Sequence, residues 1–133
     1  MDSTTRLIRD GEIQVQGPKE RVIQKIDLLA PQLIELATTI HDHPETRFRE
    51  YHAVEALSAA LARFGYPPET GIGELKTAFR STHSFGRAGK NVAFFAEFDA
   101  LPEIGHACGH NLIAAAAIGA FLAFHDLKDG LDG

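Results

Sequence analysis

The chain has 133 residues, of which 44% are hydrophobic and 23% charged, and its formal net charge is −5. This composition is ordinary for one globular domain, and its acidic balance gives no reason to expect nucleic acid or a membrane surface as a partner. A single cysteine excludes an internal disulfide and favours a reducing, cytoplasmic location. No signal-peptide pattern and no apolar run of about 18 residues is present, so we expect no membrane span.

The first half of the chain predicts a flexible arm followed by two helices. Residues 1–16 are polar without a sustained period, which predicts a poorly ordered arm. Gly17-Pro18 is a helix-start signal, and apolar residues recur at helical spacing from Val22 to Ile40, with Pro31 as a point of kinking or division. A second amphipathic pattern covers 49–64 and ends at Gly65.

The second half predicts a β-hairpin, a loop rich in metal-ligand residues and a buried helix. Residues 74–81 and 91–98 are strand candidates, and 83–90 is long enough to be the hairpin loop between them. The strand at 91–98 is apolar on both faces, and the segment 112–124 is apolar around nearly its whole circumference. Two strands make a marginal sheet, so we expect this chain to be a piece of a larger α/β protein or to need a partner chain.

The loop before the last helix carries His106, Cys108 and His110 at alternate positions. Alternate residues of an extended backbone point to one side, so two of them can meet one metal ion, and thiolate with imidazole suits Zn²⁺. Asp99, at the end of the predicted strand, is either a ligand or the group that orients an imidazole. Glu97 is either a paired carboxylate or a neighbour of the metal site, and Glu45 is interpreted as a solvated turn residue.

Two further interpretations of the same residues stay open at this point. A lone cysteine is more often a small buried hydrophobe than a ligand, and a lone histidine is more often a surface or core residue. Cys108 with a histidine also suits nucleophilic hydrolysis, although no third group that would orient the base is evident from the sequence.

The motifs Ala96-Glu-Phe-Asp-Ala-Leu-Pro102 and Gly105-His-Ala-Cys-Gly-His-Asn111 resemble the metal-site signature of the M20 metallopeptidase family, in its amidohydrolase branch. The upstream His41-Asp-His-Pro-Glu45 is similar to a segment of the same branch, and the spacing looks most like the M20 domain-containing protein 2 type of dipeptidase. The resemblance covers about residues 20–127.

The resemblance implies an α/β fold in which residues 17–133 are the N-terminal part of the catalytic domain: two helices, a β-hairpin, a site loop and a buried helix. It implies a centre of two divalent ions, Zn²⁺ or Mn²⁺, with Cys108 and His110 as ligands and Asp99 orienting them. His106 matches a position that is not a direct ligand. Complete family members are often homodimers.

The implied function is the N-terminal portion of a metal-dependent amidohydrolase or dipeptidase that cleaves an amide bond of a dipeptide or N-acyl amino acid. The general base is not in this chain, because the family's Glu-Glu pair is absent from the sequence. The alternative is a catalytically inactive remnant or a partner-binding fragment of that fold.

Overall fold

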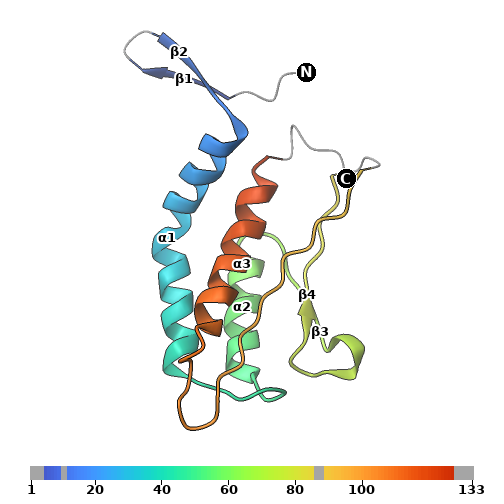
Figure 1. The fold of residues 1–133 in the computed structure, drawn as a ribbon. Helices are drawn as coiled ribbons and strands as arrows, with labels where there is room; N and C mark the ends of the chain where they lie inside the picture. The colour runs from blue at the N-terminus through green and yellow to red at the C-terminus, as the bar shows by residue number, and fades with distance from the viewer. Residues whose placement is uncertain (1–4, 10–11, 86–88, 128–133) are drawn as a thin grey trace.

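The computed structural model describes residues 5–9, 12–85 and 89–127, and its elements are shown in Figure 1. They are, in chain order, β1 (Thr5–Arg9), β2 (Glu12–Gln16), α1 (Pro18–Asp42), α2 (Tyr51–Arg63), β3 (Glu69–Thr70), a 3₁₀ turn (Ile72–Glu74), β4 (Phe79–Arg80) and α3 (His110–His125). The described part is thus a small mixed fragment of helices and two-stranded sheets.

All three predicted helices are confirmed, within a few residues at their ends. α1 begins at Pro18 after Gly17 and continues through Pro31 without division. α2 ends at Arg63, and the predicted stop signal Gly65 follows it with a φ of +87°, the left-handed conformation that glycine adopts without strain. Helical periodicity is a local property of the sequence, which is why it could be recognised without tertiary information.

The hydrophobic core lies between the three helices. Each helix contributes a stripe of buried apolar side chains: Leu29, Leu36 and Ile40 from α1, Ala53, Leu57 and Leu61 from α2, and Ala114, Ile118 and Leu122 from α3. Removing these stripes from water is the main source of the stability of such a bundle. α2 and α3 are thereby held side by side against α1 (Figure 1).

α1 and α3 run antiparallel and are joined by a polar contact near each end of α3. Asn111, buried at the start of α3, donates a hydrogen bond from its side chain to the carbonyl of Ala37, at 3.1 Å. At the other end Lys25 forms an ion pair of 3.5 Å with Asp126. Between these points a Cβ built on Gly119 would lie 2.7 Å from Cδ1 of Leu33. The two helices therefore approach closely because position 119 has no side chain.

The predicted β-hairpin of 74–81 with 91–98 is wrong. Only Phe79–Arg80 is a strand, and it pairs antiparallel with Glu69–Thr70 rather than with 91–98. Residues 72–74 form a 3₁₀ turn. The middle of the predicted hairpin loop, 86–88, lies outside the described residues. The alternating pattern identified an extended segment, but a strand also needs a neighbour, and none of the described residues supplies one at 91–98.

Two short strands lie within residues 1–16, for which the sequence predicted a poorly ordered arm, and that prediction stays untested. β1 and β2 form an antiparallel hairpin in which Thr5 pairs with Gln16 and Arg9 with Glu12. In the sequence, Ile13 and Val15 alternate with polar residues, and this short period of two is typical of a strand. The proposed boundary between an arm at 1–16 and a domain at 17–133 remains a prediction.

Large apolar side chains remain exposed on the described surface. They include Ile34, on α1, and Leu112, on α3, at 66% and 62% exposure. The helix predicted to be buried is therefore covered on one side only. None of the helices in the described ranges combines the length and the apolar character that crossing a bilayer requires.

Candidate functional site

The site loop that joins residue 98 to α3 is held by its own backbone. Leu101 and Gly105 exchange two hydrogen bonds of 2.9 and 3.0 Å, and the amide of Gly109 donates to the carbonyl of His106 at 2.9 Å. Gly109 then precedes α3 with a φ of +80°, so a side chain at this position would be strained. The helix begins at His110, close to the start that the sequence predicted.

The segment His41-Asp-His-Pro-Glu45 lies against this loop. The amide of Ala100 donates to the carbonyl of Glu45 at 2.7 Å, and residues 46 and 100 form an isolated parallel bridge. A Cβ on Gly105 would touch the ring of Pro44 at 3.6 Å. Two motifs that are more than fifty residues apart in the sequence therefore build one corner of the molecule.

Glu45 is not the solvated turn residue that the sequence predicts. Its two carboxylate oxygens accept hydrogen bonds from the amides of His52 and Ala53, at 3.1 and 3.0 Å. These amides belong to the first turn of α2 and have no partner within the helix, so Glu45 caps it. The carboxylate comes from outside the helix, which is why the usual capping patterns do not reveal it.

Asp99 orients the imidazole of His110. Nδ1 of the ring lies 2.7 Å from Oδ1 of Asp99 and 3.0 Å from the carbonyl oxygen of the same residue. Both of these atoms accept hydrogen bonds, so Nδ1 carries the proton. This contact corresponds to the orienting role, one of the two roles predicted for Asp99. In the neutral ring, Nε2 of His110 then carries no proton.

Nε2 of His110 faces the carboxylate of Glu97, with Oε2 at 3.3 Å. When the ring is neutral, both atoms are hydrogen-bond acceptors, and two acceptors at this distance repel unless a cation lies between them. A proton on the ring or a bound metal ion satisfies both. Glu97 therefore contacts His110 through a carboxylate that is 62% exposed, and its place beside a metal ion stays a prediction.

Cys108 and His106 lie in different surroundings. Cys108 is a free, exposed thiol in the turn before α3. His106 is 8% exposed, so its ring lies inside the fold. Its ring centroid is 6.4 Å from that of His41. The side chains of His106 and Cys108 therefore do not point to the same side of the loop, although the two residues stand at alternate positions.

Burial lowers the pKa of His106 from its ordinary value, and the neighbouring His41 lowers it further. His110 acts in the same direction on this pKa, whereas the backbone of Ile40 and the carboxylate of Asp99 oppose the shift. His106 is accordingly neutral at physiological pH. A neutral imidazole is also the form that binds a metal ion, so the position of His106 outside the ligand set stays a prediction.

No three His, Cys, Asp or Glu side chains converge on a point suited to a metal ion within the described ranges. Asp99 and Glu97 contact opposite nitrogens of His110, so they flank the ring rather than converge. Among the described residues, Cys108 forms no hydrogen bond with His110. A cysteine nucleophile activated by this histidine would need that contact, although Asp99 does orient the histidine. The ligand roles of Cys108 and His110 remain predictions.

Several curated proteins are similar to this chain. One component of the p-aminobenzoyl-glutamate hydrolase of Escherichia coli (strain K12) is 36% identical over 106 residues, which cover 67% of this chain and 22% of that protein. The Xaa-Arg dipeptidase of Mus musculus is 36% identical over 115 residues, covering 78% and 26%. The Xaa-Arg dipeptidase of Homo sapiens is 33% identical over 135 residues, covering 92% and 30%.

The chain thus spans between 22% and 30% of the length of these relatives. No family model matches it. The relatives are nevertheless the dipeptidases and amidohydrolases that the motifs around Asp99 and Cys108 led us to expect. Over the region that it shares with them, the chain belongs to the M20 family of amidohydrolases and dipeptidases.

Proposed function

We propose that this chain provides the first metal-binding elements of an amidohydrolase that cleaves the amide bond of a dipeptide or an N-acyl amino acid. The observation that carries the proposal is the pairing of His110 with Asp99 at 2.7 Å, which leaves the other ring nitrogen facing Glu97. The names of the relatives support the reaction class, since they are a hydrolase of p-aminobenzoyl-glutamate and two dipeptidases.

The donor set suits a borderline divalent ion such as Zn²⁺ or Mn²⁺. His110 would hold the ion through Nε2, and Cys108 through its thiolate, with Asp99 fixing the imidazole ring. The acceptor-to-acceptor contact between Nε2 and Glu97 fits a bound cation at this place. When bound, such an ion supplies Lewis acidity for the hydrolysis of an amide.

The residues of this chain do not complete the reaction by themselves. The resemblance assigns the general base to a glutamate of a Glu-Glu pair, and this sequence has no such pair. Two protein ligands also leave a catalytic zinc short of its usual three. We therefore propose that hydrolysis requires polypeptide of the kind that the relatives carry outside the shared region, and that two ions and a homodimer belong to that complete assembly.

The test is calorimetric titration of ZnCl₂ and MnCl₂ into the purified 133-residue chain. We expect binding that falls by at least about tenfold in Cys108→Ser and in His110→Ala, because each variant removes one donor. Ala107→Ser is the matched control, since it places the same hydroxyl on the neighbouring exposed residue. Titration with Co²⁺ adds a readout that is specific for sulfur, the thiolate-to-cobalt absorption band.

Equal affinity of the wild type and Cys108→Ser, with no thiolate band, would reject Cys108 as a ligand. The alternative function, an inactive fragment that binds a partner, is favoured by the exposed apolar side chains. It predicts no hydrolysis across a dipeptide panel even with metal supplied. The cytoplasmic location predicted from the single cysteine suits both functions, because a reducing compartment keeps the thiol of Cys108 free.

A further inference from the structure

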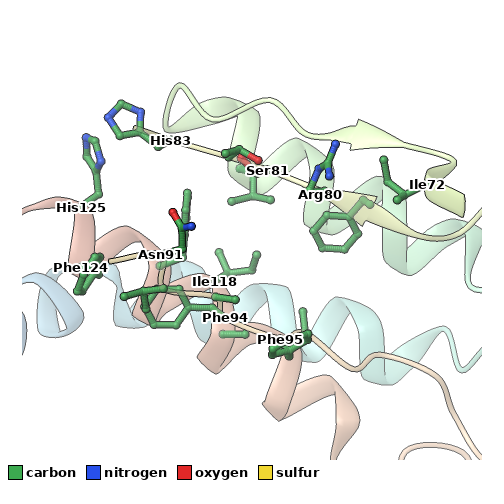
Figure 2. A pocket seen from close by; sticks show the side chains of 18 of the residues that line it. Ile72, Arg80, Ser81, His83, Asn91, Phe94, Phe95, Ile118, Phe124 and His125 are labelled. Carbon is green, nitrogen blue, oxygen red and sulfur yellow. The ribbon is translucent and has the colours of Figure 1, made fainter. Parts of the chain in front are cut away.

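α3 borders open space on two sides. Between residues 117 and 125 it lines an apolar groove of about 1050 Å³, into which Ile118 and Phe124 project (Figure 2). On another side a smaller hollow lies between this helix and α1. Apolar packing therefore covers only part of α3, and the position of the helix along α1 depends strongly on a few specific contacts.

The first turn of α3 has no side-chain cap. Gly109 stands at the N-cap position, where serine, threonine, asparagine or aspartate ordinarily accepts a hydrogen bond from a helix amide. Its carbonyl accepts the amides of Leu112 and Ile113, at 3.0 and 3.1 Å, but it has no side chain to add. Because His110 is the first residue of this helix, the direction of its ring depends on a turn that must be held in another way.

Asn111 attaches this first turn to α1. Its side chain is 6% exposed, and its amide nitrogen donates a hydrogen bond to the carbonyl oxygen of Ala37 at 3.1 Å. Position 111 requires a neutral donor, because an aspartate would bury a carboxylate against that carbonyl, and both groups are acceptors. The carboxamide thus performs from the neighbouring helix a task that a cap would perform locally.

The same end of α1 also contacts the site loop on the other side of His110. The ring of His106 lies beside that of His41, and the backbone of Ile40 is close enough to raise the pKa of His106 against the effect of burial. The segment 107–110, which carries both predicted ligands, therefore lies between two places where the chain meets α1.

We infer that Asn111 is a positioning residue for His110, because it attaches the first turn of α3 to α1 and so holds the imidazole against Asp99. The inference deepens the proposed function and rests on it, since a fixed ring serves metal binding. The ring position itself can nevertheless be observed without metal. Nδ1 of His110 lies 2.7 Å from Asp99, and a shift of the first turn would break this contact.

The tautomer of His110 reports whether the ring is held, because its contact with Asp99 places the proton on Nδ1. Long-range proton–nitrogen NMR spectra of the metal-free 133-residue chain at pH 8 measure the ratio of the two tautomers, and His110→Ala identifies the signal. We expect Asn111→Leu and Asn111→Ala to lower the ratio of the Nδ1–H to the Nε2–H form by at least about fivefold, which corresponds to the loss of one ordinary hydrogen bond. Leucine keeps the volume of the side chain, and alanine cannot clash.

Two controls separate position from stability. Asn91→Leu makes the same substitution at an exposed asparagine and should leave the tautomer ratio unchanged. Leu29→Ala opens a cavity in the core about two helical turns before Ala37, so it destabilises the fold without touching the attachment. This variant should also keep the ratio of the wild type. Urea unfolding measures the stability of every variant, and far-UV circular dichroism checks that the helices persist.

An unchanged tautomer ratio in both variants of Asn111 would overturn the inference, and so would an equal shift in Leu29→Ala. Failure of both variants to fold would overturn it too, because Asn111 would then support the whole fold rather than one ring. Zinc titration separates this result from the proposed function. A wild type that binds no Zn²⁺ rejects the metal site but not a shifted tautomer ratio, whereas Zn²⁺ binding with an unchanged ratio rejects only the positioning role. Where both hold, Asn111→Leu should bind Zn²⁺ about tenfold more weakly.

Discussion

At the scale of single residues, the arrangement around His110 depends on Asp99. If the Asp99 carboxylate fixes the ring, Asp99→Asn should reduce Zn²⁺ affinity by roughly 10- to 100-fold, because an amide both weakens the hydrogen bond and permits the wrong ring orientation. Calorimetric titration measures the loss. Glu103→Gln, in the same loop and exposed, is the matched control and should bind as the wild type does. Unchanged affinity in Asp99→Asn would show that the carboxylate does not support a ligand.

Tyr66 gives a pH-dependent prediction. Burial raises the pKa of Tyr66, and the carboxylate of Asp126 raises it further. The neutral phenol packs against Phe121 and His125, with centroids at 5.2 and 4.7 Å. Because the folded pKa lies above the unfolded value of about 10, this contribution to stability is complete below pH 10 and is lost as the pH rises through the folded pKa.

Urea unfolding at pH 8 and at pH 11 tests the role of Tyr66. The wild type should lose more stability over this interval than Tyr66→Phe does, since phenylalanine cannot ionise. Tyr51→Phe, at the exposed second tyrosine, should follow the wild type. A Tyr66→Phe variant with the same alkaline loss as the wild type would contradict the prediction.

At the scale of elements, the cap on α2 joins the fold to the site. Glu45 accepts two amide hydrogen bonds from the first turn of α2, while its own carbonyl binds Ala100, next to Asp99. Glu45→Ala should therefore lower the free energy of unfolding by about 0.5 to 2 kcal/mol. Urea unfolding measures the change. Glu55→Ala, on the exposed face of the same helix, is the control and should stay close to the wild type.

The contact between α1 and α3 gives a second prediction at this scale. The buried Gly119 faces Leu33 so closely that a larger side chain must displace it. Gly119→Val should destabilise the chain by about 1 to 3 kcal/mol, the usual cost of overpacking a core. Ala116→Val, at an exposed position of the same helix, introduces the same β-branched side chain without the clash. Equal stability of the two variants in urea would show that the helices move apart at little cost.

Features that depend on neighbouring residues could be predicted from the sequence, whereas features that depend on distant segments could not. The starts of α1 and α3 follow from Gly17-Pro18 and from Gly109, which are local signals. The contact of Asp99 with an imidazole was one of two roles that the sequence left open, because Asp99 and His110 stand at the two ends of one loop. The cap by Glu45 and the pairing of β3 with β4 did not, since both depend on segments that only the folded chain brings together.

At the scale of the whole molecule, exposed apolar surface predicts how the isolated chain behaves. A hollow of about 480 Å³ lies between α1 and α3 and is lined mostly by apolar residues, among them Ile34 and Leu112, together with Thr38, His41 and Asn111. Monomeric proteins rarely leave such patches bare, so we expect the chain to self-associate as its concentration rises and to bind a hydrophobic dye. Sedimentation velocity and dye fluorescence measure the two effects.

The double variant Ile34→Glu with Leu112→Glu removes apolar surface from this hollow and should reduce both effects. Its control is Gln24→Glu with Gln32→Glu, which adds the same two negative charges at exposed polar positions of α1. If charge repulsion alone prevented association, the two double variants would behave alike. A lower dye signal in the first variant only would show that the uncovered face of α1 and α3 drives association, as expected of a chain that spans less than a third of its relatives.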